Sequence, residues 1–355
     1  SITLSAFMAG IGFGAYMWGQ YTDKTSRPLL VYAKIEIAIA VSCALLSPLI
    51  AKLGPVYAWL HLWFPGIPIL LTLVKGILSF LLMFFPATLM GATLPIIGKY
   101  YVENDSQLSS RIGILYGANT LGAAVGCALT GFVLISAIGV LQTSWLAAGI
   151  NLLVGIGALR VFQESEPEES SNWNIPWPSK PKFEWKDEDK LWLTISFVCG
   201  FLALAYEILW TRLLVFSMTS SAYSFSMMLT VFLLGIVIGS FLVIPALKVC
   251  PNPRTLIIIL QASAGIYVVI SMYGLESILS SPWNGYNLQE ASTTFIKYFK
   301  DSASLMLPPT ILMGMCFPLL IRAIVKDPLA VGGEVGRVYA FNTLGGIAGS
   351  AIGGV

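Results

Sequence analysis

A carboxylate inside an apolar run is the side chain in this sequence with the clearest capacity for chemistry. Glu207 lies in the run of residues 191–217, next to Tyr206. An isolated carboxylate in apolar surroundings is costly, so it must be protonated, paired or exposed to water. Two interpretations stay open. Glu207 is either a cation or proton site facing a central cavity, or a structural carboxylate bonded to a neighbouring helix.

Other polar residues occur in apolar runs at corresponding places in the two halves of the chain. Glu36 occupies the place that Gln261 holds later, which predicts a symmetric pair near the interface between the halves. Two further sets correspond in the same way: Tyr116 with Asn119, and Tyr339 with Asn342. Carbonyl and phenol oxygens of this kind either line a cavity for an amine or hydrogen-bond between helices.

These correspondences reflect a duplication of the chain. Three blocks recur in the same order, offset by 223 or 225 residues: FMAGIGFG (7–14) as FLLGIVIG (232–239), PATLMGATLP (86–95) as PTILMGMCFP (309–318), and GILYGANTLGAAVG (113–126) as GRVYAFNTLGGIAG (336–349). Duplication within a very apolar chain is typical of membrane transporters.

The composition also indicates a membrane protein. Hydrophobic residues make up 56% of the chain and charged residues 11%, with a mean hydropathy of +0.80. A soluble domain carries about 25% charged residues. We therefore expect the lipid bilayer to be the main partner of this chain. A net charge of +2 gives no basis for nucleic-acid binding.

No residue pattern predicts a catalytic, cofactor or metal site. His61 is the only histidine, and the five cysteines show no CxxC spacing. The glycine-rich GIGFG at 10–14 lies inside an apolar run without a preceding strand, so it indicates close helix packing rather than a nucleotide loop.

The apolar runs predict an all-α, polytopic, major-facilitator-like bundle. Runs of about 20 residues span a bilayer. The expected spans are 2–19, 29–51, 67–98, 112–136, 139–161, 191–217, 221–247, 255–273, 303–325 and 338–355. Prolines predict a bend in the third span and in its counterpart at 303–325.

The distribution of basic residues predicts the orientation of these spans. With alternating spans, most lysines and arginines in loops share one side, which the positive-inside rule makes cytoplasmic. We therefore expect an integral protein of a bacterial-type plasma (inner) membrane.

The expected domain organisation is two repeats joined by a charged linker. Twelve of the 38 charged residues (20 basic and 18 acidic) fall within 163–190, which predicts a cytoplasmic linker. Residues 1–162 form the first repeat, without its opening helix, and residues 191–355 the second, without its last helix. Restoring both gives six plus six helices, which makes the two repeats parallel. We expect the chain to be a fragment holding about ten of twelve spans.

Several motifs together resemble one known family. These are GFxxLxYExLWxRLL at 200–214, SSAYSFS at 220–226, and the repeated LMGxxxP and GxxYxxNTLG blocks. In combination they resemble the membrane portion of the fused major-facilitator/spermidine-synthase proteins. The resemblance covers most of the chain outside the linker.

The resemblance implies a cytoplasmic spermidine-synthase-like domain in the same protein, after the helical part. Such a domain would transfer an aminopropyl group from decarboxylated S-adenosylmethionine to putrescine. The strand, glycine-rich loop and acidic residues for that reaction do not occur in this chain, so no enzyme activity is expected from it alone.

Three functions follow as hypotheses. The chain is the membrane domain of a spermidine-synthase-like fusion linked to polyamine synthesis or transport, where Glu207 and Glu36 would suit a cationic solute. Alternatively, it is a secondary transporter of another small solute, or a non-transporting anchor for a cytoplasmic enzyme.

Overall fold

The structure is a computed structural model that describes residues 2–52, 54–55, 58, 68–101, 108–165, 187–218, 221–274, 288–325 and 330–354. His61 and most of the predicted linker lie outside these residues. The first repeat contains α1 (Ile2–Thr22), α2 (Pro28–Ala51), α4 (Pro68–Tyr101), α5 (Leu108–Leu129), the π-helical turn η2 (Thr130–Leu134) and α6 (Ile135–Ser165). The second contains α7 (Asp187–Met218), α8 (Ser221–Val249), α9 (Pro253–Ser271), the 3₁₀ turn η3 (Met272–Gly274), α11 (Leu288–Gly314), α12 (Cys316–Ile324) and α13 (Val331–Gly354).

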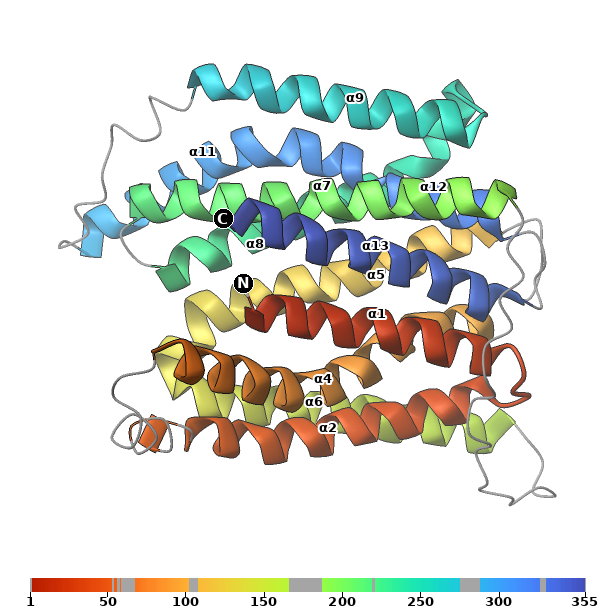
Figure 1. The fold of residues 1–355 in the computed structure, drawn as a ribbon, viewed down its shortest axis with the longest axis horizontal. Helices are drawn as coiled ribbons and strands as arrows, with labels where there is room; N and C mark the ends of the chain where they lie inside the picture. Colours follow the sequence, from red (N-terminus) through yellow and green to blue (C-terminus); the bar gives the residue numbers. More distant parts are fainter. Residues whose placement is uncertain are drawn as a thin grey trace.

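The all-α bundle confirms the predicted fold class. The long helices run along one common direction, with α2 and α9 on opposite sides of the bundle (Figure 1). Every predicted span coincides with a helix. Among the described residues, seven stretches are long and apolar enough to cross a membrane, and one of them, Gly113–Glu164, contains both α5 and α6.

Two helices of the second repeat begin earlier than their expected spans, α11 at Leu288 and α13 at Val331, whereas the break between α5 and α6 falls where it was expected. α11 begins at Leu288 rather than near 303 because its first turns are amphipathic: Tyr298 and Ser302 are buried while Lys297 and Lys300 are exposed. Hydropathy alone does not detect such a helix. Between α5 and α6 the chain reverses at Gly139, whose φ of 83° favours glycine.

The proline-rich spans behave differently in the two repeats. In the second repeat, α11 ends at Gly314 and α12 begins at Cys316, so the span is interrupted between Pro309 and Pro318, where a bend was expected. In the first repeat, α4 continues through its two prolines.

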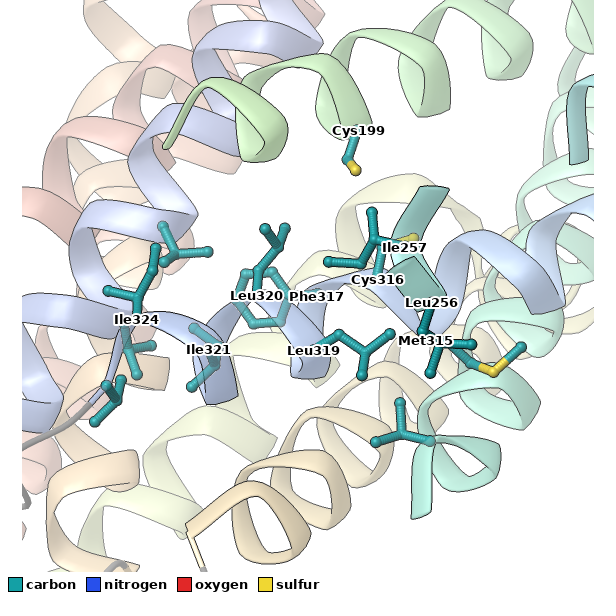
Figure 2. Packing of buried hydrophobic residues seen from close by; sticks show 14 of the residues in the cluster. Cys199, Leu256, Ile257, Met315, Cys316, Phe317, Leu319, Leu320, Ile321 and Ile324 are labelled. Carbon is teal, nitrogen blue, oxygen red and sulfur yellow. The ribbon is translucent and has the colours of Figure 1, made fainter. Parts of the chain in front are cut away.

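α12 lies at the centre of the largest buried cluster. Leu319, Leu320 and Ile321 have no exposed surface, and they pack among side chains of α7, α8, α9 and α13 (Figure 2). Apart from Arg322 and Ala323 in its last turn, α12 is apolar and buried, as is typical of a helix in the interior of a bundle. This cluster ties the second repeat together.

The contacts between helices repeat with the sequence. α1 packs along α4 as α8 packs along α11, and α1 crosses α13 as α8 crosses α5. The correspondence extends to single residues. A Cβ added at Gly91 would lie 2.1 Å from the carbonyl oxygen of Ile11, and one at Gly314 would lie 2.6 Å from that of Ile236. The two repeats therefore share the same close backbone contacts.

A pair of glycines on α13 packs against another helix, whereas the corresponding pair on α5 does not in the described part of the chain. A Cβ at Gly345 or Gly349 would lie 1.8 or 2.1 Å from a carbonyl oxygen of α7. At the corresponding Gly122 and Gly126 of α5, a Cβ would meet no atom within 4 Å among the described residues. These pairs therefore provide a matched test of glycine packing.

We expect Gly345→Ala to lower the free energy of unfolding by about 1–3 kcal/mol, because the methyl group overlaps the α7 backbone. Gly122→Ala should be neutral or stabilising by up to about 1 kcal/mol, because alanine favours the helix. Thermal unfolding of the purified protein in detergent measures both. Equal midpoints for the two variants would contradict the close α7–α13 contact.

Candidate functional site

Glu207 is a buried carboxyl where the two repeats meet. Its residue surface is 7% exposed, and the thiol of Cys127 on α5 is near enough to interact with it electrostatically. Among the described residues, no hydrogen bond or ion pair reaches its carboxyl oxygens; only its backbone carbonyl accepts a bond, from Thr211. A buried carboxyl without a protein partner is expensive when ionised, so it has the capacity to bind a proton or a cation.

Small polar side chains of α8 accompany this carboxyl. Ser226 and Thr230 are both buried, and Thr230 lies against the Cys127 thiol. The Cys127 sulfur is 3.8 Å from the carbonyl oxygen of Ser226. Cys127 on α5 therefore lies near Glu207 on α7 and near Ser226 and Thr230 on α8.

The predicted Tyr116 and Tyr339 do come together. The ring of Phe317 on α12 lies between them, 4.5 Å from the Tyr116 centroid and 5.7 Å from the Tyr339 centroid. Helices α5, α12 and α13 meet at this aromatic stack. The two phenols thus contact one aromatic ring, and their predicted role in binding an amine stays a prediction.

Gln261 reaches the edge of the same region. Its Nε2 lies 3.2 Å from the sulfur of Cys199 and 3.4 Å from that of Cys316, the residue before Phe317. Its Oε1 is buried and has no hydrogen-bond partner among the described residues. Gln261 therefore joins α9 to α7 and α12.

Glu36 does not join Gln261. Its carboxyl is hydrogen-bonded to the phenol of Tyr32, one turn earlier on α2. α2 and α9 occupy opposite sides of the bundle (Figure 1). The predicted pair at the repeat interface does not form, because the two-fold relation between the repeats separates these corresponding helices.

The remaining predicted residues have other surroundings. Asn342 donates to the carbonyl oxygen of Ser196, 3.2 Å away, and so holds α13 against α7. Asn119, its counterpart, is exposed on the uncovered face of α5. Tyr206 stacks on Trp210 in a separate apolar cluster. The described residues contain no group of three or more His, Cys, Asp or Glu suited to a metal.

Asp23, which the sequence analysis did not single out, joins the two repeats at one end of the bundle. It follows α1, and its Oδ1 and Oδ2 accept hydrogen bonds from the amides of Gly332 and Gly333 at 2.8 and 2.7 Å. Lys99 Nζ, from the end of α4, lies 3.2 Å from the Asp23 carbonyl and 3.9 Å from Oδ1. One residue thus contacts α4 and α13.

The chemistry of this contact follows from helix termini. The first amides of a helix lack intrahelical partners, and a carboxylate satisfies them while complementing the helix dipole. A Cβ at Gly333 would lie 2.6 Å from Asp23 Oδ2, so glycine permits the approach. Burial raises the pKa of the Asp23 carboxyl above its ordinary value, whereas the amides of Gly333 and Gly332 and the charge of Lys99 lower it.

The contact has no acidic equivalent in the second repeat. At the repeat offset of 225, the residue in place of Asp23 is Lys248. An acidic residue in a short loop, combined with two glycines at the start of a distant helix, was the available sequence signal. It is too weak to identify the pair without the fold.

We expect Asp23→Asn to destabilise the α1–α13 contact by about 1–3 kcal/mol, since an amide accepts at one atom only and leaves a helix amide unpaired. Glu334→Gln is the control, because the Glu334 pair with Arg337 lies within α13 and is worth about 0.5 kcal/mol or less. Thermal unfolding in detergent compares them. If both variants unfold at the same temperature, Asp23 does not hold the repeats together.

The comparisons with known proteins agree with this architecture. No curated protein matches the chain. The family model described as Major Facilitator Superfamily matches residues 1–354. That match extends over both repeats. The chain therefore belongs to the Major Facilitator Superfamily and is a membrane transporter domain of that type.

Proposed function

We propose that this domain binds a small cationic solute, of the polyamine class, at Glu207. The observation that carries the proposal is the buried Glu207 carboxyl without a protein partner at the junction of α5, α7 and α8. A cation that leaves water needs a compensating negative charge, and an amine also needs oxygen acceptors. Ser226 and Thr230, which lie near the same Cys127 thiol as Glu207, supply buried hydroxyl oxygens of this kind.

The location of Glu207 also supports a role in transport rather than in packing alone. α5 belongs to the first repeat, and α7 and α8 belong to the second. Movement of one repeat relative to the other would change the access of water to a group at their junction. The Asp23 contact lies at one end of the same interface, where it would stabilise one of the two arrangements.

The link to polyamines rests on the resemblance of residues 200–226 and the repeated blocks to the fused major-facilitator/spermidine-synthase proteins. In that proposal, a cytoplasmic spermidine-synthase-like domain of the same protein makes or uses the solute, with decarboxylated S-adenosylmethionine as its co-substrate. The end of the bundle holding Lys24, Arg27, Lys99, Lys248 and Arg254 would face the cytoplasm, by the positive-inside rule.

We expect Glu207→Gln to weaken the binding of labelled putrescine and spermidine at least tenfold, because the amide removes the compensating charge. The measurement is equilibrium binding to the purified, reconstituted protein. Glu36→Gln is a matched control: it removes a buried carboxyl that is already bonded to Tyr32, so binding should stay within about twofold.

Saturable binding that both variants retain would make Glu207 structural. Absence of saturable polyamine binding to the unmodified protein would refute the proposed solute class. In that case, proton uptake on reconstitution, compared between the unmodified protein and Glu207→Gln, tests whether the carboxyl serves as a proton site in transport of another solute.

A further inference from the structure

Two buried thiols meet between α7 and α12. Cys199 on α7 is 6% exposed, and Cys316, the first residue of α12, is 2% exposed. The two thiols are hydrogen-bonded to each other. Figure 2 shows the Cys199 side chain directed from α7 toward the region where Cys316 lies. Sulfur atoms from two separate helices are therefore within reach of a single ligand.

The side-chain amide of Gln261 on α9 is bonded to both sulfurs. Its Nε2 lies 3.2 Å from the Cys199 sulfur and 3.4 Å from the Cys316 sulfur. Its Oε1 is buried and has no hydrogen-bond partner among the described residues. The two sulfurs, rather than a partner of the oxygen, therefore hold this amide in place. A neutral thiol is a weak acceptor and an ionised group a strong one, so two N–H donors directed at sulfur suit a pair of thiolates.

The surroundings restrict which ion two thiolates could bind. Leu256, Ile257 and Leu320 belong to the same buried cluster and keep water away from the sulfurs. The described residues offer no group of three or more His, Cys, Asp or Glu, so a metal that needs four such ligands, as Zn²⁺ does, is not accommodated there. Soft monovalent cations prefer sulfur and are satisfied by two thiolates in a near-linear arrangement.

The Cys316 thiol has one further contact. Its sulfur lies 3.6 Å from the carbonyl oxygen of Leu312, one turn earlier, which accepts the proton of the neutral thiol. That proton must leave when the sulfur binds a metal, because the thiolate is the ligand. Binding should therefore be tighter at higher pH.

We propose that Cys199 and Cys316 form a binding site for one soft monovalent metal cation of the Cu(I) or Ag(I) class, with Gln261 as the residue that positions the sulfurs. On binding, both thiols release their protons to solvent and two sulfur–metal bonds form, with no change in the oxidation state of metal or sulfur. Two thiolates and one singly charged cation leave one negative charge. The N–H groups of Gln261 donate to the sulfurs and stabilise that charge.

The site does not depend on the proposed polyamine site. Cys199 precedes Glu207 by eight residues on α7, which corresponds to about 12 Å along the helix. A cation bound by Cys199 and Cys316 would join α7 to α12 and, through Gln261, to α9. Loss of polyamine binding in Glu207→Gln would therefore leave the metal site intact, and the two proposals can fail separately.

The first experiment measures Cu(I) binding to the purified protein in detergent, without oxygen, in competition with a chromophoric Cu(I) chelator. We expect Cys199→Ser/Cys316→Ser to bind Cu(I) about a hundredfold more weakly or worse, because both ligands are lost. Cys43→Ser/Cys250→Ser is the matched control: it also removes two thiols, from α2 and from the residue after α8, and its affinity should stay within about threefold.

Equal losses in the two double variants would show uptake of Cu(I) by any thiol and would overturn the site. Unchanged binding by Cys199→Ser/Cys316→Ser would overturn it as well. X-ray absorption of the Cu(I)-loaded, unmodified protein needs no variant that folds. Two sulfur ligands are the expected result, and a centre with three or more ligands, or with nitrogen or oxygen ligands, would contradict the proposal.

A third variant tests the role of Gln261. Gln261→Leu keeps both thiols and a side chain of similar size but removes the N–H donors, so we expect Cu(I) affinity to fall about tenfold or more with the same number of ions bound. Far-ultraviolet circular dichroism and the unfolding temperature establish that this variant is folded. A folded Gln261→Leu protein that binds Cu(I) as tightly as the unmodified chain would refute positioning by Gln261.

Discussion

Close approach of helix backbones through glycine is the constraint on which the rest of this structure depends. Within a bilayer, lipid tails are as apolar as leucine, so helices gain little from hiding apolar side chains from lipid. Packing contacts at short range must hold them together instead. Gly91 against Ile11 and Gly314 against Ile236 supply the same contact in each repeat. The α1–α4 and α8–α11 pairs are thus packed in equivalent ways.

The two repeats share their glycine contacts, but the polar residues at corresponding positions differ. Asp23 bonds to the start of α13, whereas Lys248 occupies the corresponding place in the second repeat. Glu36 is bonded to Tyr32, whereas Gln261 contacts two cysteines. The two repeats therefore share their helix contacts but differ in the polar contacts that corresponding residues make. Glu207 has no protein partner for its carboxyl oxygens among the described residues, and this observation is the basis of the proposed cation site.

The predictions from sequence succeeded where the signal is local and failed where it depends on geometry between helices. The spans follow from apolar length, and the break near Pro309 and Pro318 follows from proline chemistry. The start of α11 was placed too late, because its first turns bury only one face. Tyr116 and Tyr339 both contact Phe317, and their predicted role in a binding cavity stays a prediction. Glu36 and Gln261 lie on helices at opposite sides of the bundle, because corresponding positions in two repeats are adjacent only near the axis that relates them.

The sequence by itself determined that this is a duplicated bundle of membrane helices, because apolar length, repeated blocks and proline positions act within one segment at a time. The tertiary structure alone decided which polar residues meet. Asp23 and Gly332 are 309 positions apart, and their contact exists only because α1 crosses α13. A side chain's partner depends on the rotation and crossing of two helices, and neither is specified by the composition of either helix.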